Sequence, residues 1–122
     1  MFETIEQRAG EDTPYVLLDV DGKCKFEGKS YPEDIASFYF PIIKWFKKYA
    51  EFGRNDLVID MKMSYFNSAS SKMLIDIFES AGDLKNKTVT VNWYYPEIDE
   101  EILEAGKIYQ GLTNLNFNFI LF

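Results

Sequence analysis

The stretch that most constrains the fold runs from Leu57 to Gly82, where the spacing of the apolar residues changes once. Between 57 and 64 every second residue is apolar, which is typical of a strand with one buried face. Between 73 and 81 the apolar residues follow helical spacing: Met73, Leu74, Ile77, Phe78 and Ala81. Gly82 is well placed to end that helix. The centre of the chain is therefore predicted to be a strand that passes through a short turn into an amphipathic helix.

Three serine hydroxyls lie at this predicted junction. At ~100° per residue, Ser70 falls near the centre of the apolar stripe and Ser71 falls at its edge. Ser68 falls on the opposite side together with Lys72, at or beside the N-cap. We therefore expect Ser68 to face solvent and Ser70 to pack inward. A serine before an apolar run commonly does no more than cap the helix, so this pattern alone does not assign a function to Ser68.

Composition bounds the class of protein. The 122 residues suit one domain (1–122), and 47% of them are hydrophobic, which is ample for a core. The net charge of −7 argues against nucleic acid or an anionic membrane as a partner. The only cysteine, Cys24, excludes an internal disulfide and fits a reducing compartment. No stretch is typical of a signal peptide or a membrane span, so we expect a cytoplasmic protein.

Several catalytic signatures are missing from the sequence. It has no histidine, which removes the commonest general base and most transition-metal sites. It also has no GxGxxG, Walker-type or CxxC motif, so we expect no cofactor, no metal and no catalytic residues. The alternative is a small enzyme that uses carboxylates such as Asp60, Asp99 and Glu100. Asp99 and Glu100 also suit a solvated helix start, and Asp60 suits an open sheet face.

The remaining elements follow from the same patterns. Strands are predicted at 15–20 and 23–27 around the hairpin signal Asp21-Gly22, and again at 88–95 and 115–119. A first helix is expected to open with a capping box from Ser30 to Glu33, and Pro41 should kink or split it. The last helix should start at Pro96, include Ile98 in its apolar stripe and end at Gly111. The residues before Pro14 are expected to be loosely held.

The element order is β-β-α-β-α-β-α-β, so the later strands should be parallel. Strands covered on both faces would be continuously apolar, whereas these strands carry polar residues on their second face. Those residues are Asp60, Lys62, Ser64, Thr88, Thr90, Asn92, Asn116 and Asn118. The predicted fold class is therefore α/β with two layers: a five-stranded mixed sheet with its helices on one face.

A five-stranded sheet with one open face and a hydroxyl at a strand–helix junction resembles the STAS domain of anti-sigma-factor antagonists. Several segments further resemble the SiaC-like regulatory phosphoproteins, in order along nearly the whole chain. These segments are Gly28-Lys29-Ser30-Tyr31-Pro32-Glu33, Phe38-Tyr39-Phe40-Pro41 before Trp45, Tyr65-Phe66-Asn67-Ser68-Ala69-Ser70-Ser71-Lys72, Trp93-Tyr94-Tyr95, Asp99-Glu100 and Glu104-Ala105-Gly106.

This resemblance implies a bacterial partner-switching protein without catalytic activity. It implies phosphorylation at the position of Ser68 by a dedicated protein kinase and removal of the phosphate by a protein phosphatase. It also implies that the unphosphorylated form binds and stimulates an output protein, a diguanylate cyclase of c-di-GMP and biofilm signalling. The acceptor in the family is typically threonine, whereas this chain has serine. Tyr65, Phe66, Asn67, Ser71 and Lys72 are the expected surround of the phosphosite.

The chemistry of the junction suits a phosphate. It would add roughly 1.5–2 negative charges beside free helix N–H groups, and Lys72 could pair with it one turn on. Repulsion and desolvation at the contact surface could then eject a partner without a large conformational change. A third hypothesis is a purely structural module that forms a homodimer through exposed Tyr65 and Phe66.

Overall fold

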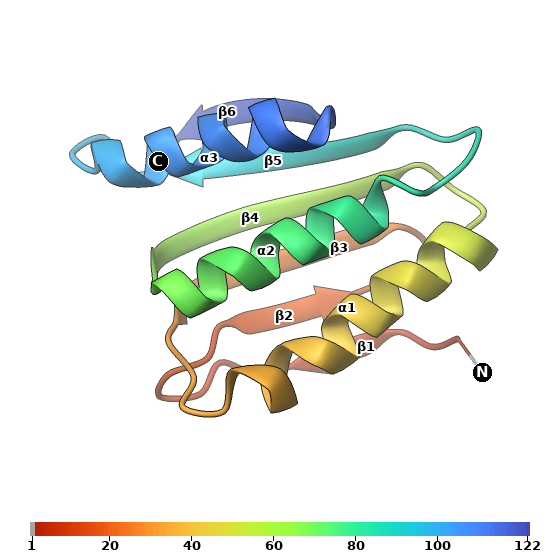
Figure 1. The fold of residues 1–122 in the computed structure, drawn as a ribbon, viewed down its shortest axis with the longest axis horizontal. Helices are drawn as coiled ribbons and strands as arrows, with labels where there is room; N and C mark the ends of the chain where they lie inside the picture. Colours follow the sequence, from red (N-terminus) through yellow and green to blue (C-terminus); the bar gives the residue numbers. More distant parts are fainter. Residues whose placement is uncertain (1) are drawn as a thin grey trace.

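The computed structural model describes residues 2–122 and contains six strands and three helices (Figure 1). The strands are β1 Ile5–Gln7, β2 Tyr15–Leu18, β3 Lys23–Ser30, β4 Leu57–Phe66, β5 Val89–Tyr95 and β6 Asn116–Leu121. The helices are α1 Ile35–Phe52, α2 Ser68–Ala81 and α3 Glu100–Thr113. All six strands form one sheet in the order β1-β2-β3-β4-β5-β6.

The sheet is mixed, as predicted. β1, β2 and β3 pair antiparallel, and β3, β4, β5 and β6 pair parallel. In Figure 1 the three helices lie in front of the sheet. Each is a crossover between neighbouring parallel strands, and the order β3-β4-β5-β6 advances in one direction, so right-handed crossovers place all three helices on one face. The two-layer α/β class is confirmed.

The two faces of the sheet differ in polarity because the side chains alternate along each strand. On the helix side Ile59, Met61, Val91, Trp93 and Phe117 are buried and Phe119 is half-buried. On the other side Asp60, Asn92 and Asn118 form a ladder across three strands. The Nδ2 of Asn92 donates to Asp60 Oδ1 at 2.8 Å, and the Nδ2 of Asn118 donates to Asn92 Oδ1 at 3.1 Å. These hydrogen bonds between neighbouring side chains explain why this face is only partly exposed to solvent.

The prediction of five strands was wrong by one. Residues 5–7, expected to be loosely held, form β1 and pair with β2. The segment before them is tied to α1, since the Nε1 of Trp45 donates to the carbonyl of Glu3 at 2.8 Å. A three-residue strand with only one apolar residue, Ile5, shows no periodicity from which it could be predicted.

The predicted start of α1 was also wrong. Ser30 does not open the helix, because β3 continues through an irregularity at Gly28 and Lys29 and pairs Ser30 with Phe66. The N-cap is Asp34, whose carboxylate accepts the N–H of Ser37 at 3.1 Å. Pro41 does not split the helix, which is continuous from 35 to 52.

α3 differs from its prediction at both ends. It begins at Glu100 with Asp99 as the N-cap, which leaves Ile98 outside the helix and 95% exposed. It continues past Gly111 and ends at Asn114, which adopts the left-handed conformation with φ of 56°. Within residues 2–122 no helix is long and apolar enough to cross a membrane.

Candidate functional site

The junction between β4 and α2 lies at the end of the sheet where the parallel strands β3 and β4 both stop. Ser30 and Phe66, the last residues of these strands, are partners in the sheet register. The N–H of Asn67 then donates to the carbonyl of Ser30 at 3.1 Å. The chain therefore leaves the sheet at a fixed point and turns directly into α2.

Asn67 is the N-cap of α2. Its side-chain oxygen accepts the N–H of Ser70 at 2.9 Å, and its carbonyl accepts the N–H of Ser71 at 2.9 Å. Ser68 is the first residue of the helix and its side chain is exposed. The first N–H groups of a helix have no acceptor within it, so those of Ser68 and Ala69 are open to solvent or to an anion. The hydroxyl of Ser68 thus lies where two unused N–H donors also lie.

Ser70 is fully buried, as the sequence predicted, and it belongs to a chain of hydroxyls. Its Oγ donates to the carbonyl of Ser30 at 3.0 Å and contacts the Oγ of Ser30 at 2.8 Å, while the Oγ of Ser30 also contacts the hydroxyl of Tyr39. Each hydroxyl has one hydrogen, so the direction follows: Tyr39 donates to Ser30, Ser30 to Ser70, and Ser70 to the carbonyl. Burial raises the pKa of Tyr39 and keeps it a neutral donor.

Ser71 is half-buried and joins α2 to α3. The hydroxyl of Tyr109 lies 2.5 Å from the Oγ of Ser71 and 3.3 Å from its carbonyl oxygen. Because Tyr109 donates its hydrogen to the carbonyl, Ser71 donates to Tyr109. Burial raises the pKa of Tyr109 as well. The hydroxyls of Ser70 and Ser71 therefore both make hydrogen bonds to neighbouring elements, whereas that of Ser68 makes none to any residue that the structure describes.

The predicted surround of Ser68 divides into exposed and packed residues. Tyr65 is 49% exposed, and Lys72 is exposed one turn after Ser68. Phe66, expected to be exposed, is half-buried and packs edge-on against Trp93 with ring centroids 6.1 Å apart. Sequence reasoning missed Tyr31, whose exposed ring packs edge-on against Tyr65 at 6.0 Å. The pairing of β3 with β4 brings these two tyrosines together, and no local periodicity signals that contact.

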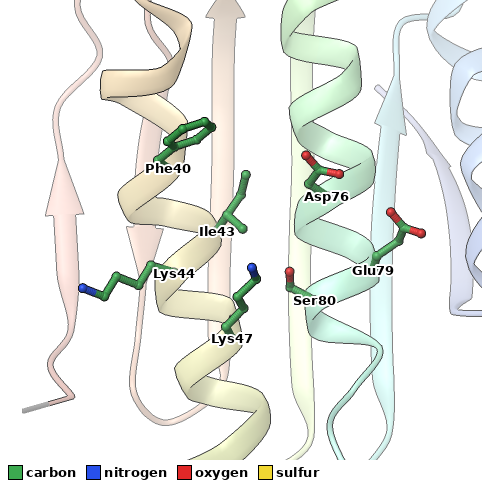
Figure 2. Close-up of a pocket in the computed structure, with 7 residues that line it drawn as sticks. All are labelled: Phe40, Ile43, Lys44, Lys47, Asp76, Glu79 and Ser80. Carbon is green, nitrogen blue, oxygen red and sulfur yellow. The ribbon is translucent and has the colours of Figure 1, made fainter.

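An open groove with a volume of about 500 Å³ lies between α1 and α2, apart from the residues predicted for the site (Figure 2). It is lined by Phe40, Ile43, Lys44, Lys47, Asp76, Glu79 and Ser80. The two lysines come from α1 and the two acids from α2, on opposite walls. Figure 2 shows Lys44 and Glu79 pointing away from the groove, so its charges do not converge on one point.

The carboxylates of the enzyme hypothesis have separate structural roles. Asp60 accepts from Asn92 on the open face of the sheet, and Asp99 caps α3 by accepting the N–H of Ile102 at 3.1 Å. Glu100 is exposed in the first turn of α3. No group of three or more His, Cys, Asp or Glu residues suited to a metal ion occurs in the part of the chain that the structure describes.

Comparison with known proteins assigns the family. The profile described as "SiaC family regulatory phosphoprotein" matches residues 6–122. The chain belongs to this family. A Pseudomonas aeruginosa protein of undescribed function is 25% identical over 100 residues, which cover 80% of this chain and 79% of the relative. The family resemblance drawn from the motifs is thereby confirmed, and the chain is a regulatory phosphoprotein of the SiaC family.

Solved structures share the fold over nearly its whole length. Apo-SiaC from P. aeruginosa has a TM-score of 0.82 at 22% identity, covering 97% of this chain and 98% of that one. SiaC in its crystal complex with the diguanylate cyclase SiaD from P. aeruginosa, where it is described as the activator of SiaD, has a TM-score of 0.87 at 23% identity and covers 97% of this chain and 99% of that one. At this identity the likeness establishes the fold.

Proposed function

We propose that this protein is a partner switch controlled by one phosphate on Ser68. A protein kinase adds the phosphate and a protein phosphatase removes it, and the unphosphorylated protein binds and stimulates a diguanylate cyclase. The family description as regulatory phosphoproteins and the complex of the P. aeruginosa relative with its cyclase support this proposal. The protein itself has no turnover in this scheme, and its single buried free thiol, Cys24, suits a cytoplasmic location.

The observation that carries the proposal is that the three serines at the start of α2 differ in exposure and in hydrogen bonding. Ser70 holds α2 against the end of β3 and Ser71 holds it against α3 through hydrogen bonds, so a kinase could reach them only by breaking those bonds. Ser68 is exposed at the first helical position, and its hydroxyl has no such role. Among the three, Ser68 is the hydroxyl that can be modified while the fold stays intact.

A phosphate at Ser68 suits its electrostatic environment in the isolated protein. It would carry roughly 1.5–2 negative charges at neutral pH beside the free N–H groups of α2, and the helix dipole favours an anion there. Lys72 lies one turn on, at a spacing that allows an ion pair. The phosphate should therefore leave the helix folded.

The same phosphate acts against a partner that covers this surface. The exposed rings of Tyr31 and Tyr65 lie beside the junction and offer a contact area. A partner that buries them must remove water from the phosphate, and the cost of burying a doubly charged group without full pairing is high. Phosphorylation thus releases the partner by desolvation and repulsion, with the fold unchanged.

The proposal is tested by binding and cyclase activity. The purified unphosphorylated protein should bind a diguanylate cyclase from the same genome and raise its rate of c-di-GMP synthesis. The form phosphorylated on Ser68 should bind at least tenfold more weakly. Ser68→Asp should weaken binding in the same direction but by less, since one carboxylate imitates a phosphate imperfectly. Equal binding and stimulation by both forms would overturn the switch.

A matched control separates the site from the fold. Ser68→Ala should keep binding and stimulation, because it removes neither the cap nor a packing contact. Thermal melting of each variant checks that it is folded. If Ser68→Ala alone abolishes cyclase binding in a folded protein, the hydroxyl is a contact rather than a switch, and the proposal fails.

A further inference from the structure

The outer edge of β6 stands out among the surfaces of the molecule. Within residues 2–122, β6 pairs with β5 alone, so one side of its backbone is open (Figure 1). It runs for six residues, whereas β1 at the opposite edge has only three. Exposed strand edges are templates for pairing with another strand, and proteins usually shorten them or place charges on them. β6 is not shortened and carries no charged side chain.

The direction of the free backbone groups follows from the pairing with β5. The N–H of Phe122 donates to the carbonyl of Tyr95, so the even-numbered residues of this strand point their backbone groups toward β5. Backbone direction alternates along a strand. Phe117, Phe119 and Leu121 therefore point their N–H and C=O groups outward, away from the sheet.

The side chains of this edge also lack charge. The segment 114–122 has the sequence NLNFNFILF and contains no charged residue, although the whole chain has a net charge of −7. Two copies that meet at this edge therefore bring no charged side chains of this segment against each other, so the net charge of the chain opposes this contact little. Leu121, at the end of the strand, is 53% exposed and adds apolar surface to the edge.

Asn118 supplies a centre for such a pairing. Its Nδ2 donates to Asn92 at 3.1 Å and ends the ladder that starts at Asp60, and its side chain is exposed. An amide has two donors and an oxygen acceptor, so hydrogen-bonding capacity remains at the open edge. A second amide related to it by a two-fold axis points in the opposite direction, so donor could meet acceptor in both copies.

We propose that β6 pairs with β6 of a second copy of this chain, antiparallel around a two-fold axis at Asn118. Phe117 of one copy then faces Phe119 of the other, and each such pair exchanges both backbone hydrogen bonds. The two Asn118 residues face each other as a non-hydrogen-bonded pair, with Cα atoms ~4.5 Å apart and the side-chain amides in contact. Two sheets join into one continuous sheet, and the helices remain on the same side.

This surface differs from the surface around Ser68. The junction of β4 and α2 lies in the interior of the sheet order, and β5 separates it from β6. Pairing through β6 therefore leaves Ser68 open in both copies. The dimer does not depend on the proposed phosphorylation switch, and either proposal can fail alone.

Cysteine cross-linking tests the register directly. Asn118→Cys places two thiols at the two-fold axis, at a separation close to that of a disulfide. Asn116→Cys is the matched control, because it lies on the same face of the same strand but would face Ile120 of the second copy. The native Cys24 is buried and should not react. Under mild oxidation Asn118→Cys should form a covalent dimer at least tenfold faster than Asn116→Cys.

Charge reversal tests the interface without a covalent bond. In sedimentation or light-scattering runs over increasing concentration, the wild type should rise from 14.3 kDa toward twice that mass. Asn118→Lys and Asn118→Asp should each stay monomeric, and a mixture of the two should form the dimer again. Circular dichroism checks that each variant is folded.

Two results would overturn the proposal. One is a wild type that stays monomeric at all concentrations. This includes the case in which another protein, rather than a second copy, has to be added before the backbone amides of β6 are protected from hydrogen exchange. The other is equal cross-linking through positions 116 and 118, which would show random collisions or a different register.

Discussion

Two helices of this protein begin at the same end of the sheet, but one start carries acidic residues and the other carries none. α3 is capped by the carboxylate of Asp99 and carries Glu100 and Glu101 in its first turn. α2 is capped by the neutral amide of Asn67, and its first turn contains serines and an alanine but no acid. Helix N-termini attract negative charge. The start of α3 already holds that charge, whereas the start of α2 leaves the place open for a phosphate.

The comparison also explains why one hydroxyl at the start of α2 is free. Ser70 connects α2 to Ser30, which in turn contacts Tyr39, and Ser71 connects it to Tyr109, so these two serines fix the position of the helix. Ser68 contributes nothing to that anchoring. A rigid helix start with one free hydroxyl allows a charge to be added without unfolding, which is what a switch at a contact surface requires.

The largest expected effect concerns a charge at Ser70 compared with Ser68. Ser70→Asp would bury a carboxylate among Ser30 and Tyr39, so we expect the free energy of unfolding to fall by ~3 kcal/mol or more. Ser68→Asp should change it by less than ~1 kcal/mol, in the stabilising direction, because the helix dipole favours an exposed anion. Urea denaturation measures both. Comparable losses for the two variants would mean that Ser68 is not the free hydroxyl.

The next effect compares the two caps. Asn67→Ala and Asp99→Ala should each lower the free energy of unfolding by ~1 kcal/mol, since each removes one hydrogen bond to a helix N–H group. The cost of Asp99→Ala should shrink as salt is raised, because part of it is the screened attraction of a charge to the helix dipole. The cost of Asn67→Ala should stay constant. Denaturation at low and high salt distinguishes them, and the reverse pattern would contradict the comparison.

A smaller effect is expected from adding an acid to α2. Ala69 is exposed in the first turn, so Ala69→Glu should raise the free energy of unfolding by ~0.3–1 kcal/mol. Glu101→Ala should lower it by a similar amount at the start of α3. If Ala69→Glu destabilises the protein, then the start of α2 does not favour negative charge, and a phosphate at Ser68 would not be tolerated as proposed.

The smallest effect concerns pH and the start of α1. The hydrogen bonds from the hydroxyl and the N–H of Ser37 lower the pKa of Asp34 below its ordinary value of 3.8. A carboxyl with a lowered folded pKa stabilises the protein above its unfolded pKa and loses that contribution as pH falls through the folded pKa. Asp34→Asn should therefore show a shallower loss of melting temperature below about pH 4 than the wild type. If the melting temperatures of the two proteins fall identically below about pH 4, then the Asp34 cap does not contribute to the pH dependence of stability.

Sequence periodicity predicted the parts of this fold that repeat locally. The alternation in β4 and β5 indicated which face is buried, and the helical wheel placed Ser70 inside and Ser68 outside. β1 was missed because three residues carry no period. Ser30 matched a capping box by spacing, but pairing with β4 holds it in β3, and a distant strand cannot be read from local spacing.

In the candidate site, too, features that depend on local spacing could be predicted and features that depend on long-range contacts could not. The exposed serine and its neighbour Lys72 could be predicted, since both depend on helical spacing alone. The bonds of Ser30 with Tyr39 and with Ser70, and the bond of Ser71 with Tyr109, join residues from different elements. So does the contact of Tyr31 with Tyr65. Long-range contacts of this kind become visible only when the chain is folded.

The central claim is that Ser68 is the one hydroxyl at this junction that is free to be phosphorylated. The most direct measurement treats the folded protein with its kinase and locates the phosphate by mass spectrometry, in the wild type, Ser68→Ala and Ser70→Ala. We expect one phosphate on Ser68 in the wild type and in Ser70→Ala, and none in Ser68→Ala. A phosphate on Ser70 or Ser71 of the wild type, or continued modification of Ser68→Ala, would contradict the account.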